Sequence, residues 1–170
     1  MVNKHFDFYN SGDNIVPALK QMLEFIGTNL PANARNEKML FKARVILTEL
    51  ITNSLKHSGS SNTSMHIAIK GTDIVIIKTD VGKPLSLVNN KTEGKVPITN
   101  DILHTLYAVT EATNQLYFVC EENKMEDILV IDDIVEHFGL LIITKASDNF
   151  TYNYDHTTKC NIFKVILTIE

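Results

Sequence analysis

The sequence predicts an α+β fold in which helices cover one sheet, and three observations lead to this prediction. Two long segments within residues 13–57 repeat apolar residues at the spacing of an α-helix. Pairs of short segments within residues 64–79 and 149–169 are rich in β-branched and aromatic residues and are separated by turn residues. The 170-residue chain is 44% hydrophobic and has no linker or repeat that would divide it, so we expect one domain over residues 1–170. These elements predict a two-layer α/β sandwich with a mixed, mostly antiparallel sheet.

The N-terminal elements are expected in the order strand, helix, helix. His5–Tyr9 alternates apolar and polar residues, as in a short strand. Asp13 is expected to cap a first helix, which should end near Leu30 because Pro31 follows. A second, longer helix is expected over about residues 35–57, where a run of Ser and Gly ends it.

Two hairpins are predicted, one after these helices and one at the end of the chain. The first joins strands at residues 64–70 and 74–79 through a turn at Gly71. The second joins strands at residues 149–154 and 161–170. We therefore expect four of the strands to be paired antiparallel.

The middle of the chain is predicted from weaker patterns. Residues 87–99 are polar and are expected to form a loop, followed by a helix over residues 101–113. A pair of strands is expected at residues 116–120 and 127–132. The short apolar segment 139–146 is compatible with either a helix or a strand.

Composition and charge exclude several classes of function. A net charge of −4 and the lack of a basic patch disfavour binding to nucleic acid or to an anionic membrane. No apolar run is long enough to span a bilayer and the N-terminus does not resemble a signal peptide, so we expect a soluble cytoplasmic protein. Cys120 and Cys160 are not in a C-x-x-C pair, which disfavours zinc; inert thiols are the simplest interpretation, and a disulfide stays open.

The second predicted helix carries a polar stripe of mixed chemistry. Glu49, Asn53, Lys56 and His57 fall within an arc of roughly 100°, opposite the leucines and isoleucines. Such a stripe is compatible with a solvated helix face, which usually carries interchangeable Lys and Glu. It is equally compatible with one wall of a polar site.

A second motif favours the site, and the ordered combination resembles a known family. The set E-L-x-x-N-S-x-K-H, a hairpin and then D-x-G resembles the nucleotide-binding domain of the GHKL superfamily, which includes DNA gyrase and sensor histidine kinases. Val45–Ser58 is similar to its asparagine motif, Thr79–Leu85 to its first glycine box and His137–Phe150 to its second. Within the superfamily, the chain looks most like the anti-sigma factor serine kinases, over residues 1–87 and 137–170.

The resemblance implies a Bergerat-type ATP-binding fold and assigns roles to the polar stripe. Asn53 would bind Mg²⁺ through its amide oxygen, a ligand type that this ion accepts. Glu49 would act as the catalytic base that orients or deprotonates the attacking hydroxyl. Lys56 or His57 would lie near the phosphates.

The glycine boxes imply contacts with the base and the phosphates. Asp80 would accept a hydrogen bond from the adenine amino group, and Gly82 would let the backbone approach the ring. Gly139 would start a helix whose N–H groups face an anion. Asn161 would stand where the family has a threonine near the adenine.

The sequence also departs from the family pattern. Pro84 and His137 occupy positions where the boxes usually have glycine. Residues 88–136 replace the usual lid and are expected to form either a rebuilt lid or a partner-binding insertion. These departures weaken the case for tight binding of a nucleoside triphosphate.

The resemblance therefore leaves two hypotheses about function. In the first, the protein is a regulator that binds Mg-ATP or ADP, and that phosphorylates a partner or switches partners with nucleotide occupancy. By resemblance, that partner would be a sigma factor or an antagonist of one, and the chain could form a homodimer. In the second, it is a non-catalytic interaction module that keeps the fold without ATP turnover.

Overall fold

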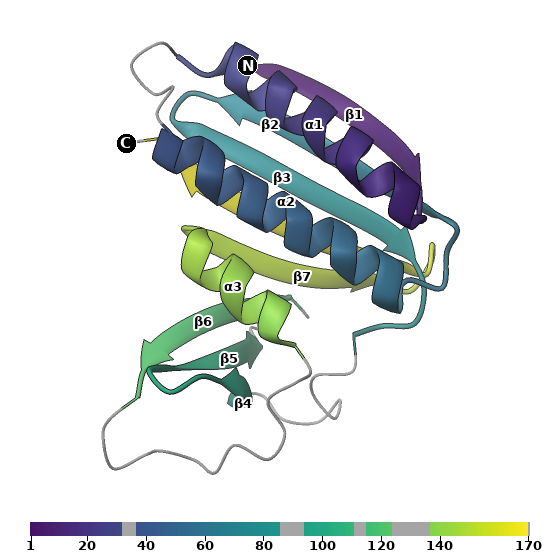
Figure 1. Cartoon of the computed structure of the whole chain (residues 1–170). Coiled ribbons are helices and arrows are strands. Elements are labelled where there is room, and N and C mark those ends of the chain that lie inside the picture. Colours follow the sequence, from purple (N-terminus) through teal and green to yellow (C-terminus); the bar gives the residue numbers. More distant parts are fainter. Residues whose placement is uncertain (32–36, 86–93, 111–114, 124–136, 170) are drawn as a thin grey trace.

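The computed structural model describes residues 1–31, 37–85, 94–110, 115–123 and 137–169. These residues form three helices and one eight-stranded sheet (Figure 1). The helices are α1 (Gly12–Asn29), α2 (Glu37–His57) and α3 (Phe138–Ala146). The strands are β1 (Val2–Tyr9), β2 (Asn62–Lys70), β3 (Asp73–Val81), β4 (Gly94–Asn100), β5 (His104–Thr110), β6 (Leu116–Glu122), β7 (Asn149–Asp155) and β8 (Cys160–Thr168).

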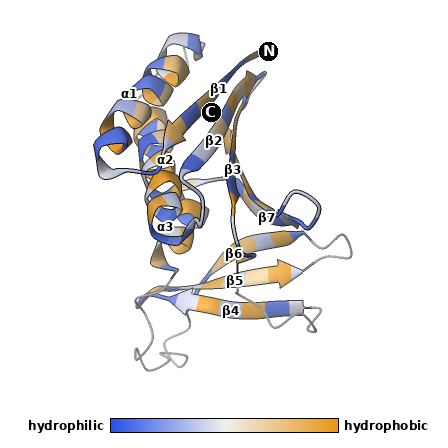
Figure 2. Ribbon diagram, turned by 90° about the vertical axis from the view of Figure 1, so that its right-hand side faces the viewer, coloured by the Kyte–Doolittle hydropathy of each residue, from blue (hydrophilic) through white to orange (hydrophobic). Residues whose placement is uncertain are grey.

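The sheet has the strand order β1-β2-β3-β8-β7-β6-β5-β4, and each neighbouring pair is antiparallel. The predicted α+β class is confirmed, and both predicted hairpins are present as β2–β3 and β7–β8. The helices lie on one face of the sheet, which Figure 2 shows from the side. This arrangement is a helix layer on a sheet layer.

The core lies between α1, α2 and the central strands. In β3 and β8 every second side chain is buried, so each strand gives the core a row of apolar residues that includes Ile74, Ile76 and Val165. The buried side of α2 carries Leu47 and Leu50, both at most 1% exposed. Because α2 buries this stripe against the sheet, its polar stripe must face another direction.

The ends of α1 differ in how well they match the prediction. The helix begins at Gly12 with Ser11 as its N-cap, so the prediction that Asp13 caps it is wrong. Asp13 instead lies in the first turn, where a carboxylate is favoured by the helix dipole. The C-terminal end is as expected, because Leu30 adopts extended dihedral angles immediately before Pro31.

The middle of the chain corrects two predictions. Residues 104–110, predicted to be helical, form β5, which pairs with β4 on one side and β6 on the other. The apolar residues that simulated a helical period are divided between a strand and a turn: Leu106 is fully buried, whereas Ile102 and Leu103 are 70% and 66% exposed. The carboxylate of Asp101 accepts hydrogen bonds from the backbone N–H groups of residues 103 and 104, which holds this turn.

The predicted loop at residues 87–99 is also partly wrong, because its described part belongs to β4. The predicted strand at residues 127–132 lies outside the described residues, while the strand at 116–120 is confirmed as β6. The ambiguous segment 139–146 is helical, within α3.

Strands β4 to β6 form a meander that extends the sheet. Its connection to the rest is short, because β6 pairs with β7 only through Leu116 with Tyr152 and Tyr117 with Thr151. Figure 2 shows the meander turned away from the direction of β1 to β3, with α3 on the same side as the other helices. The described part of the 88–136 region therefore builds sheet rather than lid.

Two further observations concern the chain as a whole. Both Cys120 and Cys160 are free thiols, so no disulfide links them. Among the described residues, no helix combines the length and apolar content needed to cross a membrane.

Candidate functional site

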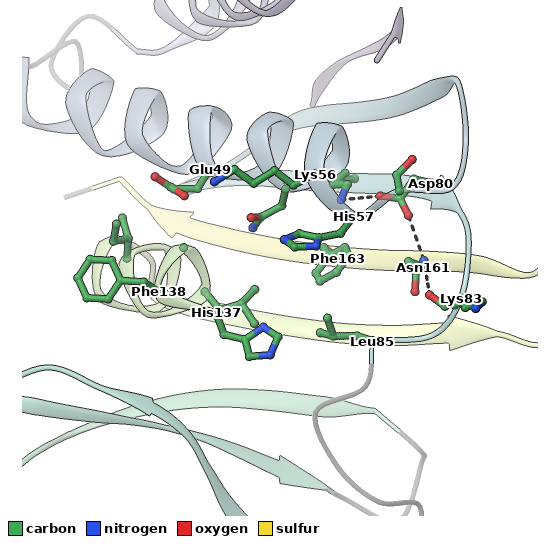
Figure 3. A pocket seen from close by; sticks show the side chains of 16 residues that line it. Glu49, Lys56, His57, Asp80, Lys83, Leu85, His137, Phe138, Asn161 and Phe163 are labelled. Atoms are coloured by element: carbon green, nitrogen blue, oxygen red, sulfur yellow. Dashed lines mark hydrogen bonds and ion pairs between the residues drawn. The ribbon is translucent and has the colours of Figure 1, made fainter. Parts of the chain in front are cut away.

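A cavity of about 340 Å³ lies between α2, α3 and the strands β3 and β8 (Figure 3). This volume is within the range of small-molecule sites, roughly 300–1,000 Å³. The cavity brings together predicted site residues from three elements: Glu49, Asn53, Lys56, His57, Asp80 and Gly139.

Gly82, the remaining predicted site residue, is not part of the cavity lining. Its backbone is tied to the β7–β8 hairpin: its N–H donates to the carbonyl of Lys159 at 3.1 Å, and its carbonyl accepts from the Tyr154 hydroxyl at 3.2 Å. A Cβ at this position would lie 3.4 Å from Asn161 Nδ2. Gly82 therefore helps to position the cavity floor.

One wall of the cavity is the polar stripe of α2. Because α2 buries its apolar side against the sheet, Glu49, Asn53, Lys56 and His57 face the cavity (Figure 3). Within the described part of the chain, none of these four side chains has a hydrogen bond or an ion pair. Their donors and acceptors are therefore available to a ligand.

The first turn of α3 lies directly against this wall. A Cβ at Gly139 would be 2.7 Å from Glu49 Oε2 and 3.4 Å from both amide atoms of Asn53. Only glycine lets the backbone of α3 approach so closely. The contact also places a carboxylate at the N-terminal end of α3, where the helix dipole favours negative charge.

His137 precedes this turn and has an unusual backbone conformation. It is the N-cap of α3 and has φ 74° and ψ 6°, in the left-handed region that glycine favours. Its carbonyl accepts a hydrogen bond from the N–H of Leu140 at 2.9 Å. The histidine thus replaces the expected glycine in side chain while the backbone keeps a glycine-like conformation.

The floor of the cavity is a buried ion pair between two residues of β3. Lys78 Nζ lies 2.5 Å from Asp80 Oδ2, and the two side chains are only 3% and 4% exposed. The ammonium also lies 4.5 Å from the centre of the Phe163 ring, in a cation–π contact. Burial lowers the pKa of Lys78, although the neighbouring Asp80 carboxylate acts in the opposite direction.

Asn161 on β8 links this pair to a wider hydrogen-bond network. Its amide nitrogen donates to Asp80 Oδ1 at 3.0 Å and to the carbonyl of Lys83 at 3.1 Å. Its amide oxygen accepts from the Tyr152 hydroxyl at 2.8 Å, and that hydroxyl accepts from the N–H of Leu85, also at 2.8 Å. Burial raises the pKa of Tyr152 to about 12. The floor is thus held in one arrangement by a chain of satisfied polar groups.

Sequence reasoning missed Lys78 and Tyr152 as parts of the site. Lys78 does have a signal in the sequence, because it lies in phase with Ile74, Ile76 and Asp80 in the strand alternation and must point inward with them. Tyr152 has no comparable signal, since its role depends on the pairing of β7 with β8.

The charges around the cavity favour an anionic ligand. Lys56, Lys78 and Lys83 line it, whereas Glu49 and Asp80 are its only carboxylates among the described residues. The described residues contain no group of three or more His, Cys, Asp or Glu side chains that could hold a metal by themselves. The oxygens of Glu49 and Asn53, both beside Gly139, nevertheless suit Mg²⁺, which takes one or two protein ligands together with phosphates and water.

Comparison with known proteins adds no assignment. No protein-family model matches the chain, and no curated protein matches it significantly in sequence. The class of protein must therefore be argued from the geometry of the cavity.

Proposed function

We propose that the chain is a nucleotide-binding regulator with a Bergerat-type fold, which binds Mg-ATP or ADP in this cavity as the anti-sigma factor serine kinases do. One observation carries the proposal. Residues from α2, β3 and α3 that are far apart in the sequence, among them Asn53, Asp80 and Gly139, line a single cavity of suitable size.

The floor would recognise the base. Two of the roughly four lone-pair positions of the Asp80 carboxylate are taken by Lys78 and Asn161, so the carboxylate keeps room for one more donor. Lys78 has further N–H groups beside it. An acceptor next to a donor complements the edge of adenine, where an amino group adjoins a ring nitrogen.

The mouth of the cavity would hold the phosphates. Lys56 and His57 on α2 supply positive or hydrogen-bonding groups, and the first turn of α3 supplies backbone N–H groups. Asn53, with Glu49 beside it, would hold Mg²⁺. When bound, this ion supplies charge neutralisation at the phosphates.

The reaction, where it occurs, would be phosphoryl transfer to a serine of a partner protein. Glu49 would accept the proton of the serine hydroxyl while its oxygen forms a bond to the γ-phosphorus and the bond to ADP breaks. A partner resembling a sigma factor or its antagonist would be the substrate. The alternative within this proposal is that occupancy by ATP or ADP selects between partners.

Isothermal titration of ADP and of a non-hydrolysable ATP analogue, with and without Mg²⁺, tests the proposal. We expect micromolar binding that Asn53→Ala and Asp80→Asn abolish. Asn149→Ala is the matched control, because Asn149 is exposed at the start of β7 and away from the cavity lining. Undiminished binding in the Asn53→Ala protein would contradict the assignment.

A second candidate function is a non-catalytic interaction module, and one observation favours it. The Glu49 carboxylate already lies against the first turn of α3, where phosphate oxygens would otherwise be placed. In that case neither nucleotide would produce heat at millimolar concentration, with or without Mg²⁺. The melting temperature would also stay unchanged, because a ligand that does not bind the native state cannot stabilise it.

A further inference from the structure

A second hollow, which we call the α2–α3 groove, lies between these two helices outside the nucleotide cavity. It has a volume of about 470 Å³. Its lining is mostly apolar and consists of Phe41, Val45, Phe138, Leu141, Ile142 and Ala146, with Lys38, Lys42, Lys145 and Asp101 around them. On α2, residues 38, 41, 42 and 45 are at helical spacing, so they form one stripe along the groove.

Exposed apolar side chains are concentrated at this groove. Phe41 is 66% exposed and Phe138 is 41% exposed, although both are large aromatic residues. Ile102 and Leu103, also largely exposed, follow directly after Asp101 in the turn between β4 and β5. Single exposed apolar residues are ordinary, whereas a hollow lined by several of them marks a surface that another molecule covers.

The charged residues of the groove determine which partner it fits. Lys145 is paired with Asp101 at 3.6 Å, which leaves no other carboxylate in the lining. Lys42 forms no ion pair within the described part of the chain, and Lys38 lies one helical turn before it. The groove therefore combines an apolar floor with an excess of positive charge at its rim.

We propose that the α2–α3 groove binds an acidic amphipathic helix of a partner protein. Two neighbouring helices with an apolar floor form the kind of groove in which a helix docks through residues at i, i+3 or i+4, and i+7. Acidic residues beside these anchors would face Lys38, Lys42 and Lys145. This inference does not depend on nucleotide binding.

The test uses a fluorescent synthetic peptide about 18 residues long, enough for five helical turns, with Leu at the anchor positions and Glu beside them. We expect micromolar binding by fluorescence anisotropy, measured without nucleotide. A peptide with the same leucines and Lys in place of Glu should bind at least about tenfold more weakly, as opposite charge complementarity requires. Equal affinity for the two peptides would overturn the proposal.

Two substitutions locate the binding site. Phe41→Asp and Lys42→Glu should each weaken the acidic peptide by about tenfold or more, equivalent to 1.4 kcal/mol. Val16→Asp and Lys20→Glu on α1 are the matched controls and should bind as the unchanged protein does, because Val16 is similarly exposed, at 71%, and neither residue lines the groove. Nucleotide titration of the Phe41→Asp protein should be unchanged, which separates failure here from failure of the proposed function.

Two further outcomes would also overturn the proposal by identifying a different occupant. A dimer in sedimentation that Phe41→Asp converts to monomer would show that a second copy of the chain covers the groove. The sequence just before α3 is acidic, and a variant with Asp127, Asp132 and Asp133 changed to Asn tests whether the chain covers its own groove. About tenfold tighter peptide binding in that variant would show that it does.

Discussion

The floor of the nucleotide cavity and its α2 wall are both polar, but they differ in how their side chains are satisfied. On the floor, Lys78 and Asp80 are at most 4% exposed and take part in a continuous network. On the wall, Asn53 and Lys56 have no side-chain partner within the described part of the chain. The floor is therefore expected to contribute to stability, and the wall to ligand affinity.

The largest effect should come from breaking the buried pair. Lys78→Met leaves the Asp80 charge buried without its counter-ion, and we expect a loss of about 3–5 kcal/mol in the free energy of unfolding. Lys56→Met is the matched control on the exposed wall and should change stability by less than about 0.5 kcal/mol. Urea denaturation measures both. Equal losses in the two proteins would remove the distinction between floor and wall.

A smaller loss is expected from Tyr152→Phe. This change removes the hydroxyl between Asn161 and the N–H of Leu85, and leaving these groups unsatisfied should cost about 1–3 kcal/mol. Tyr107→Phe is the control, because the Tyr107 hydroxyl has no hydrogen bond within the described part of the chain. A loss as large in that protein would mean that the phenol ring, rather than the network, explains the effect.

A modest gain is expected at the edge of the wall. His137→Gly should increase stability by about 0.5–1 kcal/mol, because glycine adopts a positive φ without strain. Lys159→Gly relieves a similar conformation, φ 56°, in the β7–β8 turn and should produce a similar gain. Thermal unfolding compares the two variants. A loss of stability in the first variant alone would show that the histidine side chain stabilises the start of α3.

The smallest effect concerns pH. The pKa of Tyr152 is raised from 10.0 to about 12 on folding, so the tyrosine contributes stability below pH 10 that is lost as pH rises toward 12. At pH 10 this loss should be about 0.4 kcal/mol. The difference in stability between the unchanged protein and Tyr152→Phe should shrink by that amount between pH 8 and pH 10, in urea titrations. A difference that grows instead would contradict the direction of the shift.

The two regions also differ in how far the sequence predicted them. The wall was predicted in full, because its residues lie within one amphipathic helix, and α2 has the expected extent from Glu37 to His57. The floor was predicted only through Asp80 and, loosely, Asn161. Its remaining partners come from strands whose register cannot be deduced from either strand alone.

The sequence by itself determined the helix and strand types of both halves of the chain, because their apolar periodicities are long and regular. It failed in the middle, where the apolar residues of 101–110 fit a helix locally and the partners β4 and β6 make them a strand. Only the tertiary structure decided that Lys78 faces Asp80 and Phe163 beneath the cavity, and that Gly139 brings α3 against Glu49. These contacts join residues from separate elements, and their energies depend on burial that exists only once the sheet and helices are packed together.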